Sequence, residues 1–287
     1  MRIHRGGPAL AGLALCLGVL AACGGSSGGQ AKGDAAPPPT VGATTPQNAT
    51  GADPADPADP AKPGAADGSS LRGKVIVIDP GHNGGNASHP SEINKQVQIG
   101  NGSKACDTSG TSTNAGYDEH AFTWDVSNRL AKLLRAKGAK VTLTRTNDTG
   151  VGPCITERAA IGNRLGADAA LSVHADGAPA SGHGFHIIEP IAVKGHNAKA
   201  VPASLRLGRI LRDAYHSGTG VPYSTYIGEK ALDRRDDLGG LNLSTVPKVF
   251  IECGNMRNAG DAAKLSSAPF RQRIAESLAK GFASYFG

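Results

Sequence analysis

Aromatic side chains are scarce in this sequence of 287 residues and make up only 4% of it. Proteins that bind single-stranded nucleic acid stack successive bases on aromatic rings, so this scarcity argues against such a function. The formal net charge of +6 would suit an acidic polymer as a partner. An ordinary solvated surface can have the same charge, so charge alone does not identify a partner.

The sequence also lacks a hydrophobic run long enough for a stable membrane-spanning helix. The apolar run 8–22 follows Arg2 and Arg5 and is too short to remain in a bilayer, so residues 1–22 are interpreted as a secretory signal. The signal ends in Leu-Ala-Ala before Cys23, which resembles the bacterial lipobox, where the cysteine is lipidated. The alternative is an ordinary signal peptide with an incidental cysteine. Export by either route excludes nucleic acid as a routine partner.

Residues 23–72 lack any hydrophobic periodicity and are rich in Ala, Pro, Gly and Asp. A segment of this composition has nothing to bury, so we expect a disordered linker. The remaining segment, 73–287, is long enough for one domain with a sizeable core. No repeat or second binding module is visible in it.

None of the five cysteines has the C-x-x-C spacing of a thiolate zinc site. Cys106 and Cys154 lie in polar, loop-like segments of an exported chain, where disulfides persist, so we predict a bond between them. Cys253 follows Glu252 in an apolar strand, and alternation along the strand turns the two side chains to opposite faces. Cys253 is therefore expected to be buried and free.

Apolar runs bounded by Gly, Pro and Asp alternate with segments of helical periodicity. This order predicts an α/β fold in a single domain, with a largely parallel twisted sheet and helices on both faces. We expect strands at 74–79, 140–145, 168–173, 184–189, 224–228 and 248–252, and helices at 119–137, 155–165, 201–216 and from 267 onward. Two long polar loops, 80–117 and 229–246, are expected between them.

Three of the predicted strands lead into a residue suited to metal chemistry: His82, His174 and Glu252. Ligands bind beyond the carboxyl ends of strands in such sheets, so these side chains could converge. A zinc hydrolase needs imidazole and carboxylate ligands, an open position for water and a further carboxylate as base. Glu119, which opens the first long helix, is a further candidate, although a carboxylate there also favours the helix dipole. A buried, unpartnered Glu252 would be costly, which favours a cation or a hydrogen-bond network nearby.

Three other polar residues are possible members of the site. Asp176 could orient a ligand imidazole or lie in an exposed loop. His183 and His186, near the start of the predicted strand 184–189, could be rival ligands. Ligation by His183 or His186 is disfavoured because no turn in strand 184–189 would bring either histidine to the site.

A series of motifs along the sequence resembles one protein family. The motifs are Val-Ile-Asp-Pro-Gly-His-Asn-Gly at 77–84, Glu119, Val-Thr-Leu-Thr-Arg at 141–145, Glu-Arg-Ala-Ala at 157–160, Gly-Ala-Asp-Ala-Ala-Leu-Ser-Val-His-Ala-Asp at 166–176, and Val-Pro-Lys-Val-Phe-Ile-Glu-Cys-Gly-Asn at 246–255 with Asn258 and Asp261. In this order they resemble the zinc-dependent N-acetylmuramoyl-L-alanine amidases of bacterial peptidoglycan. The stretch 83–117 is longer than the usual family connection, and its role is unassigned.

The resemblance implies that His82, Glu119 and His174 bind Zn²⁺ and that Glu252 is the catalytic carboxylate. It implies hydrolysis of the amide between N-acetylmuramic acid and L-alanine in peptidoglycan or its muropeptide fragments, for cell-wall remodelling or recycling. We expect an exported monomer of the cell envelope that contacts the membrane only through a lipid anchor at the outer face of the cytoplasmic membrane. Otherwise it is expected to be periplasmic or secreted. The alternatives are a zinc peptidase acting on the stem peptide and a catalytically silent wall-binding lipoprotein.

Overall fold

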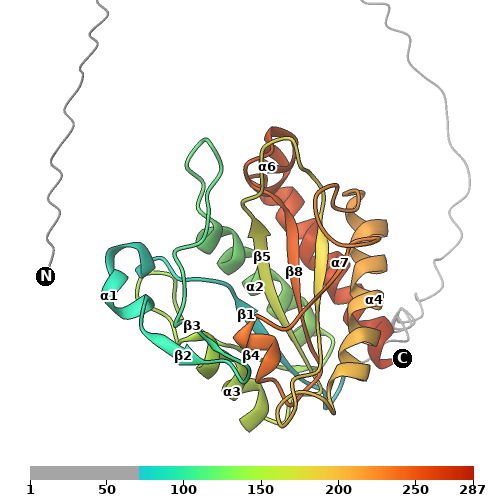
Figure 1. Ribbon diagram of the computed structural model, residues 1–287. Coiled ribbons are helices and arrows are strands. Elements are labelled where there is room, and N and C mark those ends of the chain that lie inside the picture. The colour runs from blue at the N-terminus through green and yellow to red at the C-terminus, as the bar shows by residue number, and fades with distance from the viewer. Residues whose placement is uncertain (1–70) are drawn as a thin grey trace, which may run out of the picture. The chain divides into compact units, whose positions relative to one another are not determined.

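A six-stranded sheet forms the centre of the computed structural model, which describes residues 71–287 (Figure 1). Its strand order is β4-β1-β5-β8-β6-β7, and β4, β1, β5 and β8 run parallel. Strand β6 is antiparallel to β8 and parallel to β7. The strands are β1 (Val75–Pro80), β4 (Lys140–Leu143), β5 (Ala169–Asp176), β6 (His186–Pro190), β7 (Leu232–Arg235) and β8 (Lys248–Asn255). The predicted largely parallel α/β sheet is confirmed.

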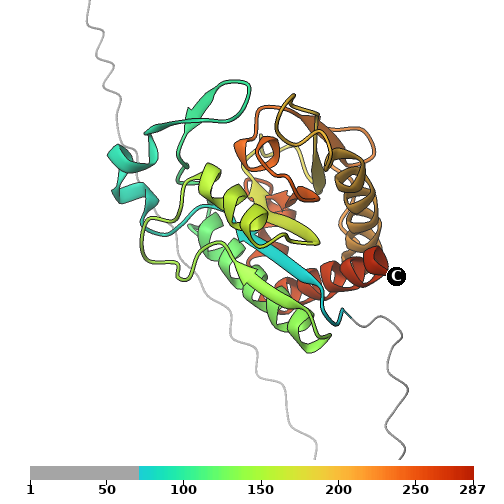
Figure 2. The ribbon, with the colours of Figure 1, turned by 90° about the horizontal axis from the view of Figure 1, so that it is seen from below.

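Helices cover both faces of the sheet, as expected (Figure 2). The long helices α2, α4 and α7 pack together on one face, and the shorter α3 and α5 lie on the other. Their bounds are α2 (Glu119–Ala136), α3 (Ile155–Arg164), α4 (Val201–Thr219), α5 (Gly239–Asn242), α6 (Ala259–Leu265) and α7 (Ala268–Phe286). None of the helices in the described part of the chain is long and apolar enough to cross a membrane.

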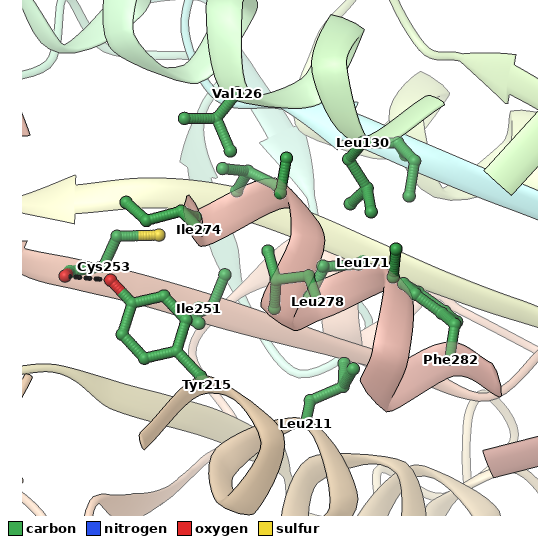
Figure 3. Packing of buried hydrophobic residues seen from close by; sticks show 14 of the residues in the cluster. Val126, Leu130, Leu171, Leu211, Tyr215, Ile251, Cys253, Ile274, Leu278 and Phe282 are labelled. Atoms are coloured by element: carbon green, nitrogen blue, oxygen red, sulfur yellow. Dashed lines mark hydrogen bonds between the residues drawn. The ribbon is translucent and has the colours of Figure 1, made fainter. Parts of the chain in front are cut away.

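The main hydrophobic core lies between the sheet and the three long helices. Ile251 of β8 packs there with Val126 of α2, Leu211 of α4 and Leu278 of α7 (Figure 3). Cys253 lies in the same core as a free, buried thiol, as predicted. Its carbonyl oxygen accepts a 2.6 Å hydrogen bond from the Tyr215 hydroxyl. Because side chains alternate along a strand, the opposite face of β8 is left for polar residues.

Several predicted boundaries were wrong, and each error has a local cause. The strand expected at 224–228 does not form. The strand at the β6 edge of the sheet is instead β7, which lies inside the expected loop 229–246. Three of its four residues are charged, so it has no apolar pattern that would predict a strand. That loop also contains α5. Strands β5 and β8 continue past His174 and Glu252, which therefore lie within strands rather than at their ends.

The expected loop 80–117 also contains short regular elements. They are a 3₁₀ turn (Asn86–Ser88), α1 (Pro90–Ile93), β2 (Gln96–Gln98) and β3 (Ser103–Ala105). Strands β2 and β3 pair as a separate antiparallel hairpin. The Asn242 amide of α5 donates to the Ile99 carbonyl oxygen of the hairpin at 3.1 Å, which attaches the hairpin to the domain.

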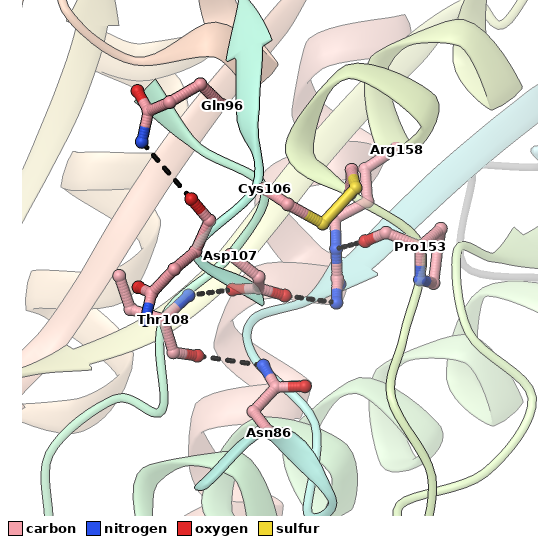
Figure 4. Close-up of a disulfide and its surroundings, with 9 residues drawn as sticks. Asn86, Gln96, Cys106, Asp107, Thr108, Pro153 and Arg158 are labelled. Atoms are coloured by element: carbon pink, nitrogen blue, oxygen red, sulfur yellow. Dashed lines mark hydrogen bonds and ion pairs between the residues drawn. A yellow bond between two sulfur atoms is a disulfide. The ribbon is translucent and has the colours of Figure 1, made fainter. Parts of the chain in front are cut away.

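A disulfide joins Cys106 and Cys154, the pair expected from the sequence (Figure 4). It connects the end of the hairpin segment to the residue that precedes α3. The Ile155 amide also donates to the Cys106 carbonyl oxygen at 2.8 Å. The predicted signal over 1–22, Cys23 and the 23–72 linker up to residue 70 lie outside the described residues. The predicted end of the linker was wrong, because Leu71 is buried in the main core and its amide donates to the Lys137 carbonyl oxygen at 2.9 Å.

Candidate metal centre

His82, Glu119 and His174 converge on one point of the polar face of the sheet. One potential ligand atom from each lies within 4.8 Å of those from the other two. The three residues come from the turn after β1, the first turn of α2 and the interior of β5. Two imidazoles and one carboxylate are the donors that zinc and similar divalent cations prefer. This is the only such group of three found among residues 71–287.

His82 occupies a strained backbone conformation, with a φ of 59° that is uncommon for residues other than glycine. Its Nδ1 lies 3.0 Å from the Thr108 carbonyl oxygen, which favours a proton on that nitrogen. Its Nε2 lies 3.1 Å from Glu119 Oε2, on the side of the cluster. Burial opposes protonation, but Glu119 and Asp107 raise the pKa of His82 well above its usual value. A cation bound between His82 and Glu119 would replace the proton on Nε2, which faces the cluster.

Glu119 lies between the two imidazoles. Its Oε1 is 2.9 Å from His174 Nδ1, and backbone amides also hold the carboxylate. The Ala175 amide donates to Oε1 at 3.2 Å and the Thr111 amide to Oε2 at 3.0 Å. Burial opposes ionisation, but the two histidines lower the pKa of Glu119 well below its usual value. The carboxylate is therefore kept ionised, as a metal ligand must be.

The backbone around His174 leaves room for its ring only because Gly81 has no side chain. A Cβ on Gly81 would lie 2.0 Å from the His174 ring. On the other side, the ring stacks on Phe250 with centroids 3.9 Å apart. Burial lowers the pKa of His174, so the imidazole is neutral and able to bind a metal. A glycine and an aromatic ring thus fix the orientation of this imidazole.

Glu252 lies directly beside His174, because the two residues are register partners in β8 and β5. Its Oε2 is buried and has no hydrogen-bond partner among the described residues. Burial and the nearby charges of Glu119 and Asp176 raise the pKa of Glu252 well above its usual value. A carboxylate with a raised pKa next to a metal site can accept and return a proton near neutral pH.

The structure places the remaining candidates outside the cluster. The Asp176 carboxylate accepts a hydrogen bond from the Gly177 amide. The carboxylate beside the His82 imidazole is that of Asp107, with Oδ1 3.5 Å from Nδ1. His186 is buried in β6 opposite Glu252, but neither it nor His183 belongs to the group of three.

A buried charged network, which the sequence analysis missed, lies below the cluster. Asp79 accepts from Arg158 and Lys248 at 3.0 Å each, from Thr144 at 2.7 Å and from Ser172 at 2.5 Å. Burial opposes ionisation, but Lys248 and Arg158 hold the pKa of Asp79 well below its usual value. Lys248 was the available signal, since a lysine inside an apolar strand requires a buried partner.

A cavity of about 590 Å³ opens beside the cluster. Its wall includes Glu252, Phe250, Lys104 of the hairpin and the α5 residues Gly240 and Leu241. The hairpin segment and the 229–246 segment therefore both line it. A cavity of this volume accommodates a small substrate or part of a polymer.

An α/β domain with two imidazoles, a ligand carboxylate and a nearby proton-accepting carboxylate has the residues of a metal-dependent hydrolase. A family model described as N-acetylmuramoyl-L-alanine amidase matches residues 76–284. The chain belongs to this family, and it is an N-acetylmuramoyl-L-alanine amidase that acts on peptidoglycan.

Individual relatives agree with the family match. The chain is 44% identical over 222 residues to N-acetylmuramoyl-L-alanine amidase Rv3717 of Mycobacterium tuberculosis, covering 77% of this chain and 90% of the relative. The crystal structure of Ami1 from Mycobacterium smegmatis is similar with a TM-score of 0.72 and 40% identity, over 76% of this chain and 99% of that one. For apo Ami1 from Mycobacterium abscessus the TM-score is 0.71 and the identity 42%, over 76% of this chain and 100% of that one.

Proposed function

We propose that the chain is a zinc-dependent amidase in which His82, Glu119 and His174 bind the metal and Glu252 is the catalytic carboxylate. The observation that supports this most is the convergence of three donor atoms within 4.8 Å. The chemistry of the donors also fits, because catalytic zinc sites commonly combine histidine imidazoles with one carboxylate, and these three residues would supply both. Bound zinc would polarise the scissile carbonyl and lower the pKa of a water molecule toward ~7.

Glu252 would transfer the proton in this reaction. Its raised pKa makes it a stronger base than an ordinary glutamate, and its place beside His174 puts it within reach of the same substrate. It would take a proton from the attacking water and return it to the amine of L-alanine as the amide bond breaks. The same residue thereby acts first as base and then as acid.

The substrate would occupy the cavity beside the cluster. The amide joins the lactyl group of N-acetylmuramic acid to L-alanine, and we propose both peptidoglycan and its muropeptide fragments as substrates, in wall remodelling or recycling. No second binding module is visible in the sequence, so the wall would be held by the catalytic domain itself. The net charge of +6 favours contact with an anionic polymer.

We further propose that the mature protein is a monomer held at the outer face of the cytoplasmic membrane by a lipid on Cys23, with the residues between Cys23 and the buried Leu71 as the tether. The support is the Leu-Ala-Ala sequence before Cys23 and the low-complexity composition after it. Mass spectrometry of membrane-extracted protein should show the added acyl mass. Unmodified protein found only in the culture fluid would contradict the anchor.

A combined metal and product analysis tests the enzymatic proposal. The purified protein should contain one zinc ion and should release intact stem peptide and free sugar from a muropeptide, as identified by mass spectrometry. Replacing His82 or His174 with alanine should remove the zinc. Cleavage within the stem peptide would indicate a peptidase, and a zinc-loaded protein without any product would indicate a wall-binding protein.

A further inference from the structure

Arg158 of α3 is a buried arginine, only 3% exposed, that lies beneath the metal cluster without contributing a ligand atom. Its guanidinium donates to Asp79 at 3.0 Å and to the Pro80 carbonyl oxygen at 2.7 Å. It also donates to the His82 carbonyl oxygen and to Asp107 Oδ2, each at 3.0 Å. One side chain thus connects the end of β1, the strained residue His82 and the segment after the hairpin.

We propose that Arg158, Asp107 and the Cys106–Cys154 disulfide form one positioning device that holds the His82 imidazole in its metal-binding orientation. The inference rests on the proposed function, because it assumes that His82 binds zinc. None of these residues touches the reacting atoms, so all are positioning residues. Their effect would appear first in the affinity for the metal.

Three hydrogen bonds lead from Arg158 through Asp107 and Thr108 to the ring of His82. Asp107, held by Arg158, accepts from the Thr108 amide at 2.7 Å through its other oxygen. The Thr108 carbonyl oxygen then lies 3.0 Å from His82 Nδ1. Asn86 donates to the same carbonyl oxygen at 2.8 Å and so fixes its direction (Figure 4). A partner that fixes one ring nitrogen of a histidine determines which nitrogen is free for the metal.

Arg158 also stabilises the backbone of His82. The φ of 59° is unfavourable for a residue that has a Cβ, so surrounding contacts must maintain it. The bond from Arg158 to the His82 carbonyl oxygen is such a contact. The arginine therefore acts on both the backbone and, through Asp107, the imidazole of the same residue.

The disulfide joins the two segments that Arg158 bridges. Cys106 precedes Asp107, and Cys154 follows Pro153, whose carbonyl oxygen accepts from Arg158 Nε at 2.8 Å (Figure 4). The covalent bond thus keeps the Asp107 segment next to the start of α3. Without it, the Asp107–Thr108 segment would depend on hydrogen bonds alone for its position.

Metal affinity separates this role from a purely structural one. We would measure the zinc dissociation constant of Asp107→Asn, Arg158→Lys and the double variant Cys106→Ser/Cys154→Ser by competition with a chelator of known affinity. Partners of ligand histidines are typically worth 10- to 100-fold in metal affinity, so Asp107→Asn and Arg158→Lys should weaken zinc binding by about that factor. The double serine variant should also bind zinc more weakly than the parent.

Asp125→Asn is the control, because Asp125 accepts from Arg129 at 2.7 Å and Arg271 at 2.6 Å, and none of the three belongs to the cluster. It should lower the melting temperature and leave zinc affinity unchanged. Parent-like zinc affinity in both Asp107→Asn and Arg158→Lys would overturn the inference, as would an equal loss in Asp125→Asn. A parent protein that binds no zinc would overturn the proposed function as well.

Discussion

Two buried carboxylates on the same face of the sheet differ in how they are surrounded. Asp79 of β1 accepts four side-chain hydrogen bonds, two of them from the cations Arg158 and Lys248. Glu252 of β8 has a buried oxygen without a partner, and its neighbours Glu119 and Asp176 are negatively charged. Their pKa values consequently move in opposite directions, down for Asp79 and up for Glu252.

The difference separates a structural carboxylate from a chemically reactive one. A buried charge with all its hydrogen bonds satisfied is locked in one state and holds the segments around it. A buried carboxylate with a free oxygen and a raised pKa binds a proton more readily than an ordinary carboxylate, so it can take part in proton transfer. Replacing Asp79 should therefore mainly reduce stability, whereas replacing Glu252 should mainly reduce activity.

The largest expected effect is on the activity of a Glu252→Gln variant. The amide has nearly the same shape but cannot accept and return a proton, so turnover should fall by ~10²- to 10⁴-fold while zinc content stays at the parent level. Product release from a muropeptide and elemental analysis are the measurements. Glu157→Gln, at an exposed position of α3, is the control and should behave like the parent. Near-normal turnover of Glu252→Gln would assign the proton transfer to another residue.

Asp79→Asn should reduce stability rather than remove a proton carrier. The amide cannot compensate the charges of Arg158 and Lys248, and breaking a buried ion pair typically costs about 3–5 kcal/mol. The free energy of unfolding from urea denaturation should fall by that amount. Asp213→Asn breaks an exposed pair with Arg212 and should change it by less than about 1 kcal/mol. Equal effects in the two variants would refute the structural role of Asp79.

Removal of the metal should lower the stability of the folded protein. A ligand that binds only the folded protein stabilises it by about 2.7 kcal/mol when its free concentration is 100 times the dissociation constant. A chelator should therefore lower the melting temperature of the parent and leave His174→Ala unaffected. A parent whose melting temperature does not respond to chelator would argue against a zinc site.

The smallest expected effect is a difference in pH dependence between the metal-free parent and Glu252→Gln. The folded-state pKa of Glu252 is raised, so its contribution to stability is fully present below the unfolded pKa of about 4.3 and is lost as pH rises through the folded pKa. Glu252→Gln lacks this loss, so its free energy of unfolding relative to that of the metal-free parent should increase from pH 4 to pH 8. The depressed pKa of Asp79 acts oppositely, with stability lost as pH falls through the folded value. Parallel pH curves for parent and Glu252→Gln would contradict the raised pKa.

The sequence by itself was sufficient for the fold class, the family and the residues that converge at the metal centre. Alternation of apolar runs with helical segments predicted the sheet, because burial of apolar side chains follows a local period of two or 3.6 residues. The same alternation placed Cys253 in the core, opposite Glu252. These features depend on neighbours in the chain and are therefore visible in one sequence.

Only the tertiary structure decided which polar residues support the ligands. Asp79 and Lys248 are separated by 169 positions and Arg158 and Asp107 by 51, so no local pattern pairs them. The positive φ of His82 and the formation of β7 also depend on distant contacts, from Arg158 in the first case and from pairing with β6 in the second. Hydrogen bonds between buried charges form only after the sheet has brought their segments together. Local periodicity therefore predicts where a strand lies, whereas the charge environment of a carboxylate is a property of the folded chain.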